Sequence, residues 1–287
     1  MRRFLPLACL LFAGLALLQP LRALERRPER SSPLDLAVKG LVEGLPKGKT
    51  GYLRWSDLAT LPQTKLKITG EFIPGEQEVT VVFVSDLLKA LPVKKQADAI
   101  VATCVDGFVS VFRQDFVARY RPFIVLEIAG VPSSAWPPKG ITYNPGPYPI
   151  TVSSKLVPEA ETYRDIEHKK PWGVGTIEFV SYADEFKPIY SGRFTNLSPG
   201  AKVGREIWIN SCVCCHAGPD HLVAGTKADR PYAVIQAYAL SAPDYFKHYV
   251  RNPQDEASCA QMEAHPHYSD EELDDIVAFI AAGAPKA

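Results

Sequence analysis

Three residues in the last third of the chain have the types and the spacing of a covalent cofactor site. Cys212, Cys215 and His216 form C-x-x-C-H, the motif to which a c-type haem is attached. Two thiols three residues apart can each form a thioether with one of the two vinyl groups on the same haem edge. The adjacent imidazole then lies beneath the iron and becomes its proximal ligand. The sequence therefore predicts one covalently bound haem.

A candidate for the second axial ligand is Met262. Apart from Met1 it is the only methionine of the chain, and it lies in a polar segment without apolar periodicity. A methionine in such a segment is poorly placed as a core filler, so its thioether is a candidate for the distal iron ligand. His265 or His267 in its place would give a bis-histidine iron of lower potential. Either pair fills both axial positions, which is the arrangement of an electron carrier.

Two further cysteines flank these ligands. Cys214 lies inside the motif, and Cys259 precedes Met262 by three residues. In an exported protein a Cys214–Cys259 disulfide would close a loop of about 45 residues and stabilise the fold by about 3–4 kcal/mol. Two unpaired thiols are the alternative, because spacing does not show whether the Cβ atoms can approach.

The elements that must position the motif are predicted to be helices. Residues 201–210 have helical apolar spacing, and residues 241–252 begin with an N-cap signal. Residues 269–283 open with the capping box S-x-x-E and continue with apolar residues at i, i+3, i+4 and i+7. A small residue on the first helix, Gly204, and an aromatic one on the last, Phe279, would let these two helices cross closely.

Residues 196–287 resemble a class I cytochrome c. The resemblance rests on C-x-x-C-H, the preceding G-R-E-I-W run, D-Y-F-K-H-Y-V-R-N-P and Q-M-E-A-H-P-H-Y-S-D-E-E-L. It implies an all-α domain, ligation by His216 and Met262, and single-electron exchange with redox partner proteins. The nearby basic residues that could pair with haem propionates are Lys227, Arg230 and Lys247.

Residues 33–192 have a different sequence pattern, in which β-branched runs alternate with short helical segments. The strand-like runs are 66–72, 79–84, 99–105, 109–112, 123–128 and 176–182, and the helical pieces are 85–90 and 113–120. Asp106-Gly107 between two of these runs is a hairpin signal. The pattern predicts an α+β domain dominated by a mixed sheet.

Several phrases here resemble the molybdopterin-binding domain of the sulfite oxidase family. They are R-W-S-D-L-A-T-L-P at 54–62, V-S-D-L-L at 84–88, V-D-G-F at 105–108, I-A-G-V-P at 128–132 and P-W-G-V at 171–174. The resemblance concerns the scaffold more than the site, and fold does not imply function.

The sequence departs from that family at the metal ligand. The family's enzymes bind molybdenum through a cysteine that precedes the segment matching residues 84–88, and no cysteine lies between residue 24 and that segment. Cys104 comes later, in a strand-like run. The arginines that could donate to pterin phosphates are Arg113, Arg119 and Arg121, and their pattern is equally typical of a solvent-exposed face. We therefore predict a sulfite-oxidase-like fold without a molybdenum cofactor.

The chain begins with the pattern of a secretory signal peptide. Arg2 and Arg3 precede the apolar run 4–18, and Ala23 ends the segment. Cleavage after Ala23 removes one cysteine and three arginines, so five cysteines remain and the net charge becomes about −3. The run is short for a membrane span, and an uncleaved anchor is the alternative. We expect a periplasmic or otherwise exported protein, associated with a membrane only if this segment is retained.

Composition narrows the function classes. With 32 basic and 32 acidic residues in 287 and 46% hydrophobic residues, the chain is neither disordered nor a polytopic membrane protein, and it has no electrostatic reason to bind nucleic acid. Three functions remain. The working hypothesis is a monohaem electron carrier, not itself an enzyme, with the N-terminal domain as docking module. The alternatives are a single-chain molybdenum oxidoreductase that reduces its own haem, and a haem-containing ligand-binding or sensor subunit.

Overall fold

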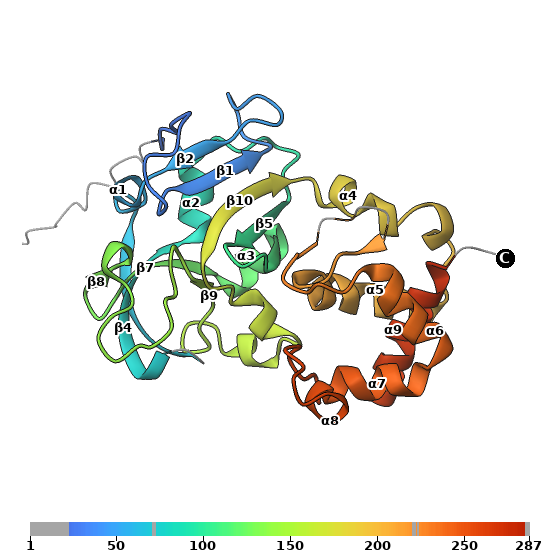
Figure 1. Ribbon diagram of the computed structural model, residues 1–287. Helices are drawn as coiled ribbons and strands as arrows, with labels where there is room; N and C mark the ends of the chain where they lie inside the picture. Colours follow the sequence, from blue (N-terminus) through green and yellow to red (C-terminus); the bar gives the residue numbers. More distant parts are fainter. Residues whose placement is uncertain (1–22, 71–72, 220–221, 223, 285–287) are drawn as a thin grey trace, which may run out of the picture.

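The computed structural model describes residues 23–70, 73–219, 222 and 224–284, and all structural statements below concern these residues (Figure 1). Except for its last residue, the predicted signal peptide lies outside them. No helix in the described ranges is long and apolar enough to cross a membrane.

The N-terminal part contains two sheets. The first has the order β2-β1-β10-β5-β6, with β1 (Leu36–Gly40) parallel to β10 (Val174–Val180) and the remaining pairs antiparallel. The other strands of this sheet are β2 (Gly51–Leu53), β5 (Ala99–Cys104) and β6 (Val109–Arg113). Strand β1 is the first and β10 the last strand of this part, so their pairing joins the beginning of the N-terminal part to its end.

The second sheet is antiparallel. It has the order β3-β4-β7-β8, and β9 also pairs with β7. The strands are β3 (Gln63–Gly70), β4 (Ile73–Phe83), β7 (Phe123–Ile128), β8 (Val131–Pro132) and β9 (Ile150–Thr151). Three short helices accompany the sheets: α1 (Trp55–Leu58), α2 (Val84–Ala90) and α3 (Gln114–Tyr120). The prediction of an α+β part dominated by sheet is confirmed.

The predicted hairpin at Asp106-Gly107 joins β5 to β6. Gly107 has a φ of +86°, and a Cβ there would lie 2.4 Å from Thr226 Oγ1. The backbone amide of Thr226 donates to Gly107 O at 2.9 Å. Glycine is therefore required both by the turn and by the close approach of the C-terminal part.

From Tyr182 onward the described residues form helices and no strand. They are α4 (Tyr182–Glu185), α5 (Pro199–Asn210), α6 (Tyr232–Ser241), α7 (Pro243–Arg251), α8 (Pro253–Glu256) and α9 (Asp270–Ala282). Figure 1 shows α5 to α9 gathered beside the sheets, with α4 next to the connection from β10. The three helices predicted here are α5, α7 and α9, and the capping box of Ser269 and Glu272 is present at α9.

The close crossing of α5 and α9 is confirmed. A Cβ on Gly204 would lie 1.9 Å from the backbone oxygen of Asp275, so only glycine fits at this contact. The rings of Trp208 and Phe279 meet beside it, with centroids 6.1 Å apart. Both aromatic residues are fully buried, which ties the helix that precedes the C-x-x-C-H motif to the last helix of the chain.

Candidate functional site

The C-x-x-C-H motif forms one tight turn at the C-terminal end of α5. Its 3-10 segment covers Cys212–Cys214, and the amides of Cys215 and His216 both donate to Cys212 O, at 3.2 and 2.9 Å. A following loop packs onto this turn, because the amide of Gly225 donates to Val213 O at 2.7 Å. A Cβ on Gly225 would lie 2.0 Å from Cys214 O, so the loop has no room for a larger residue.

Burial sets the protonation of the three motif side chains. It raises the pKa of the Cys212 thiol to about 12 and that of Cys215 to about 11. Burial, assisted by the charge of Arg230, lowers the pKa of His216. The imidazole is therefore neutral near pH 7, which is the form that binds a metal. Its Nδ1 is buried without a hydrogen-bond partner among the described residues. Two thiols and a neutral imidazole on one turn fit the donor set that a c-type haem needs.

Met262 lies in the loop between α8 and α9. Its side chain is partly buried and packs against the apolar cluster that also receives Cys212 and Ala224. The charge of the neighbouring Glu263 acts on the Cys215 thiol, so this loop faces the motif. Met262 and the motif residue Cys212 thus border the same apolar cluster.

The two alternative histidines have contacts of their own, and the charge of His216 acts on the nearby His265. His265 is 8% exposed, and its ring stacks against His168 and Tyr268 with centroid distances of 5.4 and 5.5 Å. Burial lowers the pKa of His265 to about 4. His267 Nε2 lies 3.2 Å from a carboxylate oxygen of Asp165. Both rings are therefore held by neighbours in a cluster at the boundary between the two parts of the chain.

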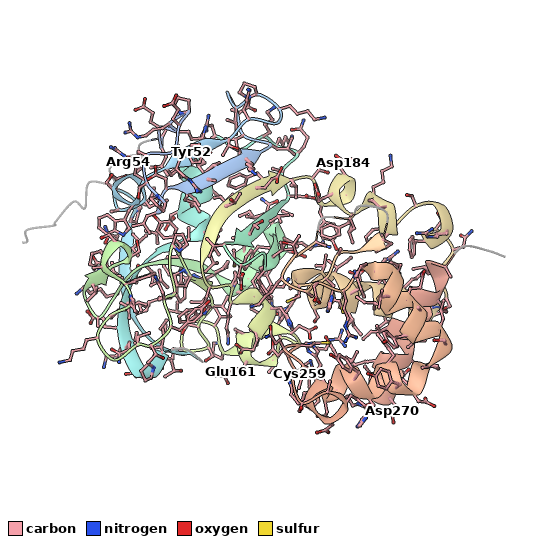
Figure 2. The ribbon with its side chains drawn as sticks, viewed as in Figure 1. Tyr52, Arg54, Glu161, Asp184, Cys259 and Asp270 are labelled. Carbon is pink, nitrogen blue, oxygen red and sulfur yellow. The ribbon has the colours of Figure 1, made fainter. Side chains whose placement is uncertain are left out.

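Of the two alternatives for Cys214 and Cys259, this structure has the unpaired one, in which both cysteines are free. Cys214 is buried, and its Sγ lies 3.7 Å from the carbonyl oxygen of Asn210 on the preceding helix. Cys259 is exposed after α8, at the lower edge of the molecule in Figure 2. The tight motif turn directs Cys214 into the core, so its Sγ is not available to an exposed loop.

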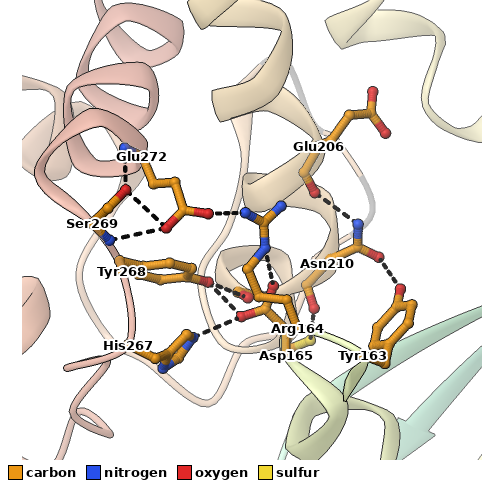
Figure 3. Close-up of polar contacts among 11 residues, drawn as sticks. Tyr163, Arg164, Asp165, Glu206, Asn210, His267, Tyr268, Ser269 and Glu272 are labelled. Atoms are coloured by element: carbon orange, nitrogen blue, oxygen red, sulfur yellow. Dashed lines mark hydrogen bonds and ion pairs between the residues drawn. The ribbon is translucent and has the colours of Figure 1, made fainter. Parts of the chain in front are cut away.

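A polar network joins the motif to the sheet part (Figure 3). The buried Asp165 accepts a hydrogen bond from the Tyr268 hydroxyl at 2.6 Å, and that hydroxyl lies 2.7 Å from Ser211 Oγ. Ser211 directly precedes Cys212. Arg164 forms an ion pair with Glu272 of α9. Nothing in the sequence singled out Asp165, because its partners lie about a hundred residues away.

Two of the three candidate propionate partners are already paired. Lys227 Nζ lies 2.9 Å from a carboxylate oxygen of Asp106, and Lys247 Nζ lies 2.9 Å from one of Asp274. Arg230 instead stacks over two tyrosine rings and acts electrostatically on His216. Both Arg230 and Lys227 therefore act on the motif, Arg230 on His216 and Lys227 on Cys215.

The described walls of the pocket beside the second sheet offer no cysteine to a molybdenum cofactor. A pocket of about 410 Å³ lies between the second sheet and the Met262 loop. None of the described residues that line it is a cysteine. The lining includes Ile68, Thr69, Phe108, His168, Trp172 and Met262. Cys104 is 5% exposed within β5, and burial raises its pKa to about 12. Cys104 is not among the described residues that line the pocket.

No family model and no curated protein matches the chain. Among solved structures, the chain is similar to the sulfane dehydrogenase SoxCD from Paracoccus pantotrophus, with a TM-score of 0.37 and 15% sequence identity. The match covers 54% of this chain and 40% of that one, so this chain spans less than half of that protein's length. The resemblance to the sulfite oxidase family therefore stays a prediction.

Proposed function

We propose that the chain is an exported electron-transfer protein with one covalent haem, held by Cys212 and Cys215. The observation that carries this proposal is the motif turn at the end of α5, which the crossing with α9 at Gly204 holds in place. A haem at this turn supplies a one-electron Fe(III)/Fe(II) couple. His216 and Met262 would be the residues that hold its iron.

The surroundings of the motif suit that role. The packing of Gly225 on the turn and the hydrogen bond between Ser211 and Tyr268 restrict the motif from both sides. A rigid frame limits the rearrangement that accompanies electron transfer. If His216 and Met262 both held the iron, no position would be open to a substrate, which suits a carrier rather than a catalyst. Its N-terminal part then serves as the docking surface for a redox partner.

A haem-containing ligand-binding subunit is the second candidate. The observation that favours it is the pocket of about 410 Å³ that Met262 helps to line. A ligand bound there would touch the distal loop directly. The ligand-binding subunit requires that Met262 can be displaced from the iron, and the carrier does not.

Carbon monoxide distinguishes the two. The full chain is produced in a host that attaches c-type haem, reduced, and exposed to the gas while its absorption spectrum is recorded. The carrier predicts an unchanged ferrous spectrum and a reversible one-electron redox titration. The Met262→Ala variant is the positive control and binds the gas. Binding by the unaltered protein would favour the ligand-binding subunit and contradict the carrier.

A further inference from the structure

A second pocket, of about 390 Å³, lies where the sheet part meets α5. Its volume is in the range of small-molecule sites. Its walls come from β6, from α3, from the segment 163–169 and from the last turn of α5. Figure 3 shows Tyr163 and Asn210 facing each other at this boundary, where the Tyr163 hydroxyl donates to Asn210 Oδ1 at 3.3 Å. The pocket is therefore built by both parts of the chain.

One wall residue is a buried lysine. Lys169 is 2% exposed, and its Nζ donates to the carbonyl oxygen of Val111 at 2.8 Å. The ammonium also lies 5.8 Å from the centre of the Phe116 ring. No carboxylate lies within ion-pair distance of it in the described part of the chain. Burial lowers the pKa of Lys169, and an anion bound beside this amine would favour its protonated form.

The other charges of this pocket do not supply that counter-ion. Asp115 lies 3.3 Å from Arg113, and Glu206 accepts from the Tyr190 hydroxyl at 2.7 Å. Arg119, on the exposed rim, contacts the Tyr120 ring at 5.2 Å and forms no ion pair with any residue that the structure describes. Two basic side chains, Lys169 deep in the pocket and Arg119 at its rim, thus have no carboxylate partner among the described residues.

We propose that this pocket binds a small organic anion, a carboxylate or a sulfonate on a compact apolar body. Its oxyanion group pairs with Lys169, since charge-assisted hydrogen bonds to an oxyanion are strong, and the charge of Arg119 at the rim attracts the anion. Its body lies against the aromatic and aliphatic wall, which includes Phe116, Tyr120 and Ile209. This inference stands without the haem. Because Asn210 lies two residues before Cys212, the bound anion contacts the helix that carries the motif.

Isothermal titration of the full chain tests the site with four probes. Benzoate and benzenesulfonate have both charge and body, benzamide lacks the charge, and inorganic sulfate lacks the body. We expect saturable binding of the first two, with benzamide and sulfate at least tenfold weaker. Lys169→Met and Arg119→Gln each weaken the two organic anions at least tenfold. Arg121→Gln is the matched control, because Arg121 lies over the Phe83 ring and outside the pocket.

Each other outcome overturns the proposal. Absence of saturable heat with both organic anions excludes the site, and equal binding of sulfate excludes the apolar subsite. Equal binding of benzamide, or unchanged affinity in Lys169→Met, removes the role of the buried charge. Lys169→Met is expected to fold, because replacing a buried basic group that lacks a carboxylate partner by an apolar side chain is often neutral or stabilising. If it does not fold, Arg119→Gln decides the same question from the rim.

Discussion

Cys212, Cys215 and His216 owe their chemical state to burial and to the turn that holds them. The thiols are protonated and the imidazole is neutral near pH 7, as the shifts in pKa require. The motif and Met262 could be predicted from residue type and spacing alone. The free and buried state of Cys214 could not be predicted, because it depends on the direction in which the turn points its side chain.

Replacing Met262 by alanine distinguishes thioether from imidazole ligation. In the haem-loaded protein we expect Met262→Ala to abolish the weak far-red charge-transfer band of ferric methionine ligation. It also lowers the reduction potential, because the soft ligand that favours Fe(II) is lost. His265→Phe keeps the ring stack and serves as the control. If His265→Phe changes the ferric spectrum while Met262→Ala does not, the iron is bis-histidine.

His168 makes stability depend on pH. Burial lowers its pKa from 6.5 to about 4, so the folded protein keeps this imidazole neutral while the unfolded chain protonates it. The unfolded state therefore binds more protons between these values, and stability falls as the pH is lowered from about 6.5 to about 4. His168→Phe should remove up to about 3 kcal/mol of this loss in urea unfolding. His248→Gln, at an exposed histidine, is the control, and an unchanged pH slope in His168→Phe contradicts the account.

Among the elements, helices with a polar face and strands with alternating or β-branched runs were predictable. The crossing of α5 and α9 followed from one small and one aromatic residue. Helix α6 was not predicted, because Y-A-V-I-Q-A-Y-A-L-S is apolar on all sides and has no helical period. Strands β1, β2, β8 and β9 were missed because they are five residues or shorter, and tertiary pairing defines them.

Two glycines of α5 provide a matched test of the crossing. At Gly204 an added methyl group would meet the backbone oxygen of Asp275, whereas at Gly200 it would meet the side-chain oxygen of the same residue. Backbone cannot move aside as a side chain can. Gly204→Ala should therefore lower the free energy of unfolding by about 3 kcal/mol or more, and Gly200→Ala by about 1 kcal/mol or less. Equal effects in thermal or urea unfolding would show that the helices do not cross at Gly204.

At the scale of the whole molecule, the sheet part and the helical part meet through polar and aromatic side chains. Asp165, Tyr268 and Ser211 connect the two parts next to the motif. Such long-range pairing leaves no local signal in the sequence, since each residue is ordinary in its own segment. The charged run around Asp165 is typical of a solvated surface, yet His168 and Lys169 within it are buried.

Removing the Tyr268 hydroxyl tests whether this boundary holds the parts together. Tyr268→Phe leaves the buried Asp165 carboxylate without its shortest donor, so we expect a loss of about 1–3 kcal/mol in the free energy of unfolding. Asp165→Asn combined with Tyr268→Phe should cost less than the sum of the two single changes. Tyr245→Phe, at an exposed tyrosine, is the control. Additive effects in the double variant would show that the two groups act independently.

The central claim, a haem bound covalently at Cys212 and Cys215, is tested most directly by intact mass spectrometry. The full chain is produced in a host that attaches c-type haem, and the mature protein is denatured in acid before measurement. The account predicts the mass of residues 24–287 plus one haem, with no adduct in a Cys212→Ala, Cys215→Ala double variant. The polypeptide mass alone, from cells that load a control cytochrome, would contradict it.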